Sequence, residues 1–102
     1  MASVPVAIFG FPSALPGKEA ELAVKLQALA AASRKEKGCL AFEVYHHPKV
    51  VNRFSLFEKF ASQAALDLHF AAAHTREFFE WFSAFGGSVT YEVWSQHGAG
   101  PA

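Results

Sequence analysis

The chain has 102 residues, the usual size of one domain, and we expect residues 1–102 to form a single domain because two independent cores would not fit. Nine basic and nine acidic side chains cancel, and the sequence shows no basic cluster typical of a nucleic-acid partner. No segment approaches the roughly 20 apolar residues of a membrane span, and Cys39 alone cannot form an intrachain disulfide, so we expect a cytoplasmic protein with no membrane contact.

The first half of the chain predicts a strand followed by a helix. The apolar run "VPVAIFGF" (4–11) is rich in β-branched and aromatic residues and stops at "PSALPG", which carries the turn residues Pro and Gly. From 18 to 37, Leu22, Leu26 and Leu29 recur at helical spacing, and Gly38 follows as a C-terminal cap.

The second half predicts a hairpin, a long helical region and a last strand. Residues 39–47 and 52–60 alternate between apolar and polar side chains. A helical region runs from Ser62, a suitable N-cap, to about Phe85, and Gly86-Gly87 separates it from a strand at 89–94. The order of elements predicts an α+β fold, the ferredoxin-like split βαβ sandwich with an antiparallel sheet.

Both faces of this sheet carry aromatic side chains. Phe9 and Phe11 lie on the opposite side of the first strand from Val6 and Ile8, and Phe57 lies opposite its own neighbours on the third strand. Helices cover only one face in this fold. We therefore expect a homodimer in which two copies pack the free sheet faces together.

Three stretches of the chain, "KGCLAFEVYHHP", "NRFSLFEKFASQAALDLHFAAAH" and "REFF", resemble the antibiotic biosynthesis monooxygenase family. The family pattern is a Gly-Cys-Leu strand, then Arg-Phe-x-Leu-x-Glu-x-Trp, Ser-x-x-Ala-Leu and His-x-x-x-x-His. Phe60 stands where the family has Trp. The positions that match are Gly38, Cys39, Leu40, Phe42, Arg53, Phe54, Leu56, Glu58, Ser62, Ala65, Leu66, His69 and His74.

The resemblance implies a subunit that dimerises into a closed α+β barrel and encloses an apolar cavity. The best-known members oxidise quinols or polycyclic phenols with molecular oxygen and use neither metal nor flavin. Other branches degrade haem or isomerise a phosphorylated, sugar-like signal. The positions matching the haem-degrading branch are Gly10, His69 and Phe79, which lack its axial ligand, so we expect no cofactor.

Glu58, His69 and His74 are the candidate catalytic residues. Strand alternation places Glu58 on the face toward the helices, where a buried carboxylate needs a proton or a donor. His69 or His74 is the expected donor, and a Glu–His pair suits a general base because the carboxylate holds one tautomer of the imidazole. The hypothesis is that one histidine is the base and that Glu58 orients it.

The spacing of the two histidines leaves an alternative open. Five residues in one continuous helix separate His69 from His74 by about 140°, and "FAAA" between them shows no helix-breaking residue. If the helix is continuous, Glu58 and His69 form a structural hydrogen bond and His74 is a capping or exposed residue. A metal site is not predicted, because the histidines lack the i, i+4 spacing of a helical ligand pair.

Four apolar residues, Leu56, Phe60, Phe78 and Trp81, are the candidate walls of a substrate pocket. The leading hypothesis is a cofactor-independent monooxygenase that oxidises a small phenolic or quinol-like aromatic molecule with molecular oxygen. An isomerase is the second, favoured if Arg53 or Arg76 reaches the cavity. A non-catalytic protein that binds a hydrophobic metabolite is the third.

Overall fold

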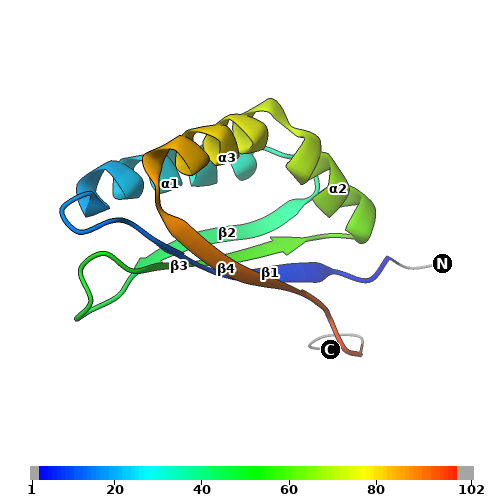
Figure 1. Cartoon of the computed structure of the whole chain (residues 1–102). Helices are drawn as coiled ribbons and strands as arrows, with labels where there is room; N and C mark the ends of the chain where they lie inside the picture. The colour runs from blue at the N-terminus through cyan, green and yellow to red at the C-terminus, as the bar shows by residue number, and fades with distance from the viewer. Residues whose placement is uncertain (1–2, 99–102) are drawn as a thin grey trace.

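The computed structural model of the protein describes residues 3–98 and contains four strands and three helices. The predicted order, strand, helix, strand, strand, helical region, strand, is confirmed. Figure 1 shows the helices on one side of the sheet. In chain order the elements are β1 (Val6–Ser13), α1 (Glu19–Ser33), β2 (Cys39–His46), β3 (Phe54–Phe60), α2 (Gln63–Ala71), α3 (Ala73–Phe85) and β4 (Ser88–Ser95).

The four strands form one antiparallel sheet in the order β2-β3-β1-β4, as the ferredoxin-like fold requires. Strands β3 and β1 are central, with Ile8 opposite Glu58 and Gly10 opposite Leu56. Among the described strands, the edge strand β4 pairs only with β1. Within residues 3–98, no helix combines the length and the apolar character that crossing a bilayer requires.

Strict alternation in the central strands determines which side chains enter the core. Along β3, the even-numbered residues Phe54, Leu56, Glu58 and Phe60 are buried, while the residues between them are half-exposed. The helices contribute Leu22, Leu26 and Leu29 of α1, Leu66 of α2, and Phe78 and Phe82 of α3 to the core. Each fully buried side chain of this size stabilises the fold by about 1.5–3 kcal/mol, so this layer holds sheet and helices together.

The segment between α1 and β2 differs from the prediction. The helix ends at Ser33 with Arg34 as its C-cap, so residues 34–38 form turns and Gly38 is not a cap. A side chain on Gly38 would clash with the Cβ atom of Ala65 on α2, which explains the glycine by close packing. Strict alternation would place Leu40 on the same face of β2 as Phe42. A bulge between Cys39 and Ala41 instead leaves Leu40 exposed.

The predicted helical region 62–85 consists of two helices. Ser62 is the N-cap, as predicted, and its Oγ accepts a hydrogen bond of 3.1 Å from the backbone N–H of Ala65. The interruption is at Ala72, whose φ of −65° and ψ of 144° are extended. The first turn of α3 starts there, because the carbonyl of Ala72 accepts hydrogen bonds from the N–H groups of Thr75 and Arg76. Gly86 ends α3 in the left-handed conformation.

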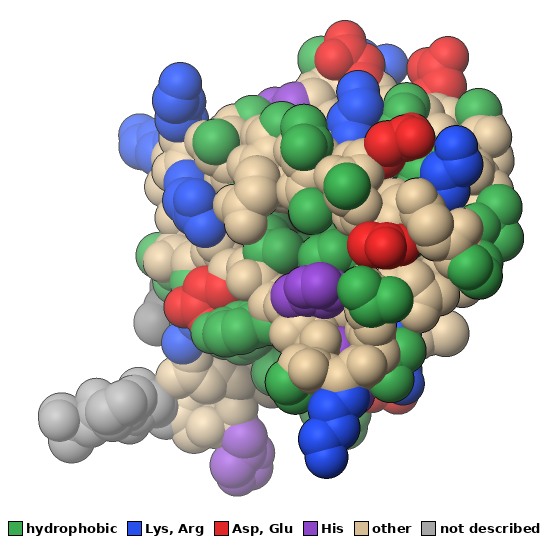
Figure 2. Space-filling view, turned by 90° about the vertical axis from the view of Figure 1, so that its left-hand side faces the viewer, with side chains coloured by type: hydrophobic (Ala, Val, Ile, Leu, Met, Phe, Trp, Pro, Cys, Tyr) green, Lys and Arg blue, Asp and Glu red, His purple; other side chains and the backbone are tan. Residues whose placement is uncertain are grey.

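The sheet face opposite the helices is apolar and exposed within the described part of the chain. Phe9 and Phe11 of β1 are 42% and 46% exposed, and Trp94 of β4 is 57% exposed. The rings of Phe9 and Phe57 lie 5.3 Å apart on this face. Figure 2 shows a different side of the molecule, where acidic and basic side chains are spread among smaller apolar areas. The aromatic sheet face therefore fits a protein partner, and the sheet-to-sheet homodimer stays our proposal for it.

The homodimer predicts that a charge on this face yields monomers. Phe9→Glu places a carboxylate in the centre of the proposed interface, where burial without a partner is unfavourable. We expect sedimentation or light scattering to give a dimer mass for the wild type and a monomer mass for Phe9→Glu. Leu68→Glu is the matched control, since Leu68 is 73% exposed on α2. A monomeric wild type at micromolar concentration would contradict the proposal.

Candidate active site

Glu58 lies in the middle of the sheet, on the side that the helices cover. It is flanked by Ile8 of β1 and by Phe42 of β2. Its exposed fraction is 5%, and its Oε1 atom makes no hydrogen bond within residues 3–98. Most buried polar atoms in folded proteins have a partner. An acid in this position is therefore a strong candidate for a functional group.

A cavity with a volume of about 40 Å³ lies beside Glu58, between the sheet and α3. The Glu58 carboxyl and the Tyr91 phenol are the polar side-chain groups among the described residues of its wall. The other walls are apolar, and Phe79, Val89 and Tyr91 are exposed at the rim. The complete lining is Ile8, Gly10, Pro12, Leu29, Leu56, Glu58, Phe70, Phe78, Phe79, Phe82, Val89 and Tyr91.

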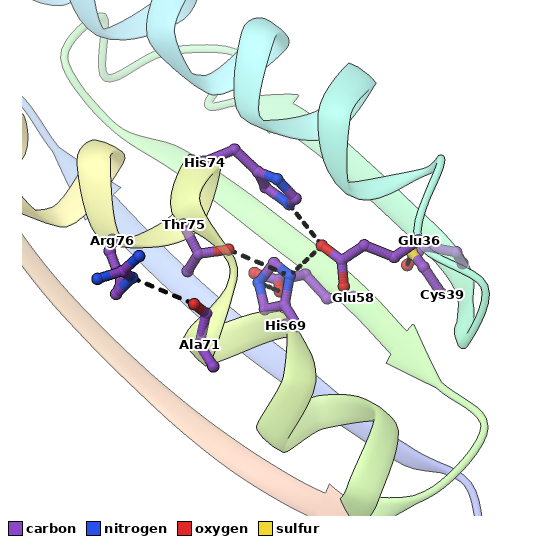
Figure 3. A network of polar contacts seen from close by, with 9 residues as sticks. Glu36, Cys39, Glu58, His69, Ala71, His74, Thr75 and Arg76 are labelled. Atoms are coloured by element: carbon purple, nitrogen blue, oxygen red, sulfur yellow. Dashed lines mark hydrogen bonds and ion pairs between the residues drawn. The ribbon is translucent and has the colours of Figure 1, made fainter.

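Behind Glu58, two histidines converge on one carboxylate oxygen. Nδ1 of His69 lies 2.7 Å from Oε2 of Glu36, and Nε2 of His74 lies 2.6 Å from the same atom. The opposite nitrogen of His69, Nε2, lies 3.4 Å from Oε1 of Glu58 without the alignment of a hydrogen bond. Figure 3 shows His69 and His74 approaching Glu36 from two sides, with Glu58 behind His69. The four side chains form one connected unit.

Two irregular segments bring this unit together. Glu36 lies in the turns after α1, which are fixed by hydrogen bonds from its N–H to the carbonyl of Ser33 and from the N–H of Cys39 to its own carbonyl. The break at Ala72 turns α3 away from the axis of α2, so that His74 can face the same point as His69. A continuous helix would hold the two rings about 140° apart.

The surroundings of Glu58 favour its protonated form. Burial, together with the negative charge of Glu36, raises the pKa of the Glu58 carboxyl from 4.5 to about 8. At neutral pH, Glu58 therefore carries a proton in the folded protein. Burial and the charge of Glu36 also raise the pKa of the Cys39 thiol, which disfavours the reactive thiolate.

The predicted pocket residues divide into two pairs. Leu56 and Phe78 line the cavity. Phe60 does not, because it is fully buried under α2 with its ring 4.7 Å from that of His69. Trp81 also lies outside the cavity, where it stacks on Phe85 at 4.5 Å and carries the Lys25 ammonium over its ring. Helical spacing grouped Trp81 with Phe78, but Trp81 lies on the side of α3 that is next to Lys25 of α1.

The three predicted catalytic residues do come close together, but Glu58 and not a histidine faces the cavity. His69 and His74 do not line it. Glu36, which was not among the predicted site residues, is the residue that joins the histidines. The sequence shows only that Glu36 stands two positions before Gly38. This spacing does not predict a contact with His69, which lies 33 positions later in the chain.

Glu36, His69 and His74 also offer two nitrogens and one oxygen within 4.8 Å of one another, a set that suits zinc or iron. Ligand atoms around a tetrahedral ion with bonds of about 2.1 Å lie about 3.4 Å apart. The N–O separations of 2.7 and 2.6 Å are shorter and match hydrogen bonds. We therefore interpret the cluster as hydrogen-bonded.

Comparisons with known proteins show the family of this chain. The family model described as antibiotic biosynthesis monooxygenase matches residues 5–81, which include Glu36, Glu58, His69 and His74. The chain belongs to the antibiotic biosynthesis monooxygenase family. An uncharacterised protein of Synechocystis is 33% identical over 76 residues, or 74% of this chain, and the chain spans about half (52%) of the length of that relative.

Solved structures share the family fold over nearly the whole chain. A protein of Pseudomonas aeruginosa is 26% identical with a TM-score of 0.86, covering 96% of this chain and 99% of the other. A protein of Deinococcus radiodurans, named as a candidate antibiotic biosynthesis monooxygenase, is 21% identical with a TM-score of 0.86, covering 95% and 97%. The family's fold is thus the fold of this chain.

The raised pKa of Glu58 predicts a stability that falls with pH. Between about pH 4.5 and about pH 8 the folded protein keeps a proton that the unfolded chain has released, so the free energy of unfolding falls across that range. This one group changes the free energy of unfolding by on the order of 5 kcal/mol across the range. We expect urea denaturation series to show this fall in the wild type and to lose it in Glu58→Gln.

The matched control for this experiment is Glu80→Gln, because Glu80 is exposed on α3. That variant should keep the pH dependence of the wild type. Parallel stability curves for the wild type and Glu58→Gln would mean that Glu58 ionises at its ordinary pKa.

Proposed function

We propose that this protein is a cofactor-independent monooxygenase that oxidises a small phenolic or quinol-like aromatic substrate with molecular oxygen. The observation that carries the proposal is the unpartnered Glu58 carboxyl in the wall of an apolar cavity. A substrate hydroxyl in the cavity would hydrogen-bond to this carboxyl from the side away from His69, whose Nε2 lies 3.4 Å from the unpartnered Oε1. In this proposal Glu58 receives the substrate proton, and His69 and His74 support Glu58 from the side away from the cavity.

The chemistry needs one proton acceptor and a dry site. Glu58, once ionised, takes the hydroxyl proton, and the phenolate then passes one electron to molecular oxygen. The substrate radical and superoxide combine to form a carbon–oxygen bond, and the peroxide anion takes the proton back from Glu58. Loss of water leaves a quinone, so a hydroquinone and one O₂ give a hydroxyquinone and one H₂O. Apolar walls keep solvent from quenching the radical pair.

The size of the cavity limits the substrate. Ligand pockets usually enclose about 300–1,000 Å³, far more than the 40 Å³ beside Glu58. A single aromatic ring enters only if side chains move, and the exposed rim residues Phe79 and Tyr91 can do so with little loss of packing. The cavity therefore favours one-ring substrates over polycyclic ones.

The isomerase alternative would be favoured if Arg53 or Arg76 reached the cavity. Arg53 lies in a separate surface groove with Tyr45 and His46, and Arg76 donates a hydrogen bond to the carbonyl of Ala71. Neither arginine is among the residues that line the cavity. This placement does not support an anionic, phosphorylated substrate. A non-catalytic binding protein remains the outcome if ligands bind without turnover.

Oxygen uptake with hydroquinone and its methylated derivatives tests the proposal. We expect the wild type to consume one O₂ per quinol and to place one atom of ¹⁸O₂ in each product. The rate should rise as pH increases through about 8, because a larger fraction of Glu58 is then ionised. Glu58→Gln should lower the rate by roughly 100-fold or more, and Glu80→Gln should leave it unchanged.

Two results of the same experiment would reject the oxygenase. One is an equal rate of quinol loss under air and under nitrogen. The other is saturable binding of every quinol tested with no oxygen uptake, which would identify a binding protein. Folding of each variant is checked by its circular dichroism spectrum, so that a lost rate is not a lost fold.

The cavity rim predicts a change in substrate size. Phe79→Ala removes an exposed ring from the rim, and two-ring quinols should then be oxidised at least as fast as one-ring quinols. The ratio of kcat/KM values for naphthohydroquinone and hydroquinone measures this change. Leu68→Ala, on the exposed side of α2, should keep the ratio of the wild type. An unchanged ratio in Phe79→Ala would place substrate entry elsewhere.

A further inference from the structure

Glu36 contacts both histidines of the site. It belongs to the turns between α1 and β2 and not to a helix or a strand. Its Oε2 atom lies 2.7 Å from Nδ1 of His69 and 2.6 Å from Nε2 of His74. These distances are at the short end for hydrogen bonds to nitrogen, as expected when one partner is charged. The His69 side chain is 3% exposed, so its ring has little freedom to rotate away.

The contact restricts the protonation of His69. An ionised carboxylate can only accept hydrogen bonds, so Nδ1 of His69 must carry the hydrogen. In the neutral ring the other nitrogen, Nε2, is then an acceptor. Nε2 points toward Glu58, with a separation of 3.4 Å from Oε1. The hydroxyl of Thr75 lies 3.4 Å from Nδ1 and can only supplement the much shorter contact with Glu36.

We propose that Glu36 is a positioning residue for Glu58: it fixes His69 as the Nδ1–H tautomer, so that the free Nε2 can take the proton of Glu58. His74 donates to the same oxygen of Glu36 and holds that carboxylate in place. The pair of Glu36 and His69 thus prepares Glu58 to receive a proton from the substrate. This catalytic use rests on the proposed function, whereas the tautomer does not.

The proton transfer is a single balanced step. The O–H bond of the Glu58 carboxyl breaks, an N–H bond forms at Nε2 of His69, and no electrons are gained or lost. The products are the Glu58 carboxylate and a His69 imidazolium that lies between two carboxylates. The 3.4 Å contact must shorten by a few tenths of an ångström for the transfer. The aromatic rings of Phe42 and Phe60 beside His69 keep water away from this step.

The other titratable groups near the unit do not replace Glu36 in this role. The Cys39 thiol on β2 is close enough to feel the charges of Glu36 and Glu58, and it keeps its proton because its pKa is raised. Arg34, at the end of α1, uses Nε to donate a hydrogen bond to the carbonyl of Phe42. His74, on α3, is 29% exposed in its side chain and contacts Glu36 rather than Glu58.

Nitrogen-15 spectra of histidine-labelled protein test the proposal without any substrate. We expect the wild type to show a proton on Nδ1 of His69. In Glu36→Gln, the amide can both donate and accept, so the fraction of His69 with a proton on Nδ1 should fall. The titration midpoint of Glu58, followed by its carboxyl carbon-13 shift, should fall by about one pH unit or more, because a nearby negative charge is lost. Glu80→Gln should change neither reading.

Three results would overturn the proposal. They are a wild-type His69 with its only proton on Nε2, a Glu36→Gln variant with both readings unchanged, and a metal ion that stays bound to the wild type through gel filtration but is lost in Glu36→Gln. If Glu36→Gln does not fold, the wild-type tautomer decides. These spectra measure no turnover, so they test the tautomer separately from the proposed function. The tautomer prediction can fail while the oxygenase proposal holds, and the oxygenase proposal can fail while the tautomer prediction holds.

Discussion

The shared carboxylate of Glu36 is the contact on which the geometry of the site depends. His69 and His74 come from different helices and meet on one oxygen atom. They could not do so from one continuous helix, and the sequence "FAAA" between them favours helix. The two short hydrogen bonds therefore stabilise an interruption that local propensity opposes. The direction of α3, and with it the placement of Phe78 and Phe79 at the cavity, depends on this tertiary contact.

The buried Glu58 shows a conflict between stability and function. A glutamine of the same shape would be easier to bury, because the ionised form of Glu58 loses its hydration in an apolar surrounding. The negative charge of Glu36 adds to the penalty. The arrangement makes sense if a weakly acidic carboxyl beside a hydrophobic cavity is useful, as in the chemistry proposed above. Strongly shifted pKa values of this kind cluster at functional sites.

Regular patterns in the sequence were sufficient for the fold, and irregular segments were not. The alternation of Phe54, Leu56, Glu58 and Phe60 correctly placed the acid on the helix side of β3. The break at Ala72 and the place of Glu36 between the two histidines involve contacts between residues more than 30 positions apart. No local pattern encodes such contacts. For the same reason, helical spacing grouped Trp81 with Phe78, although only Phe78 reaches the cavity.

The edge strand β4 has a consequence for ligand entry. All eight of its residues are exposed, and within residues 3–98 it pairs with one neighbouring strand only. Val89 and Tyr91 of this strand nevertheless form part of the cavity wall. Edge strands with few buried contacts open at low free energy. The most exposed part of the cavity wall is thus the margin of the sheet. A partner protein bound along β4 would therefore change how readily a ligand enters the cavity.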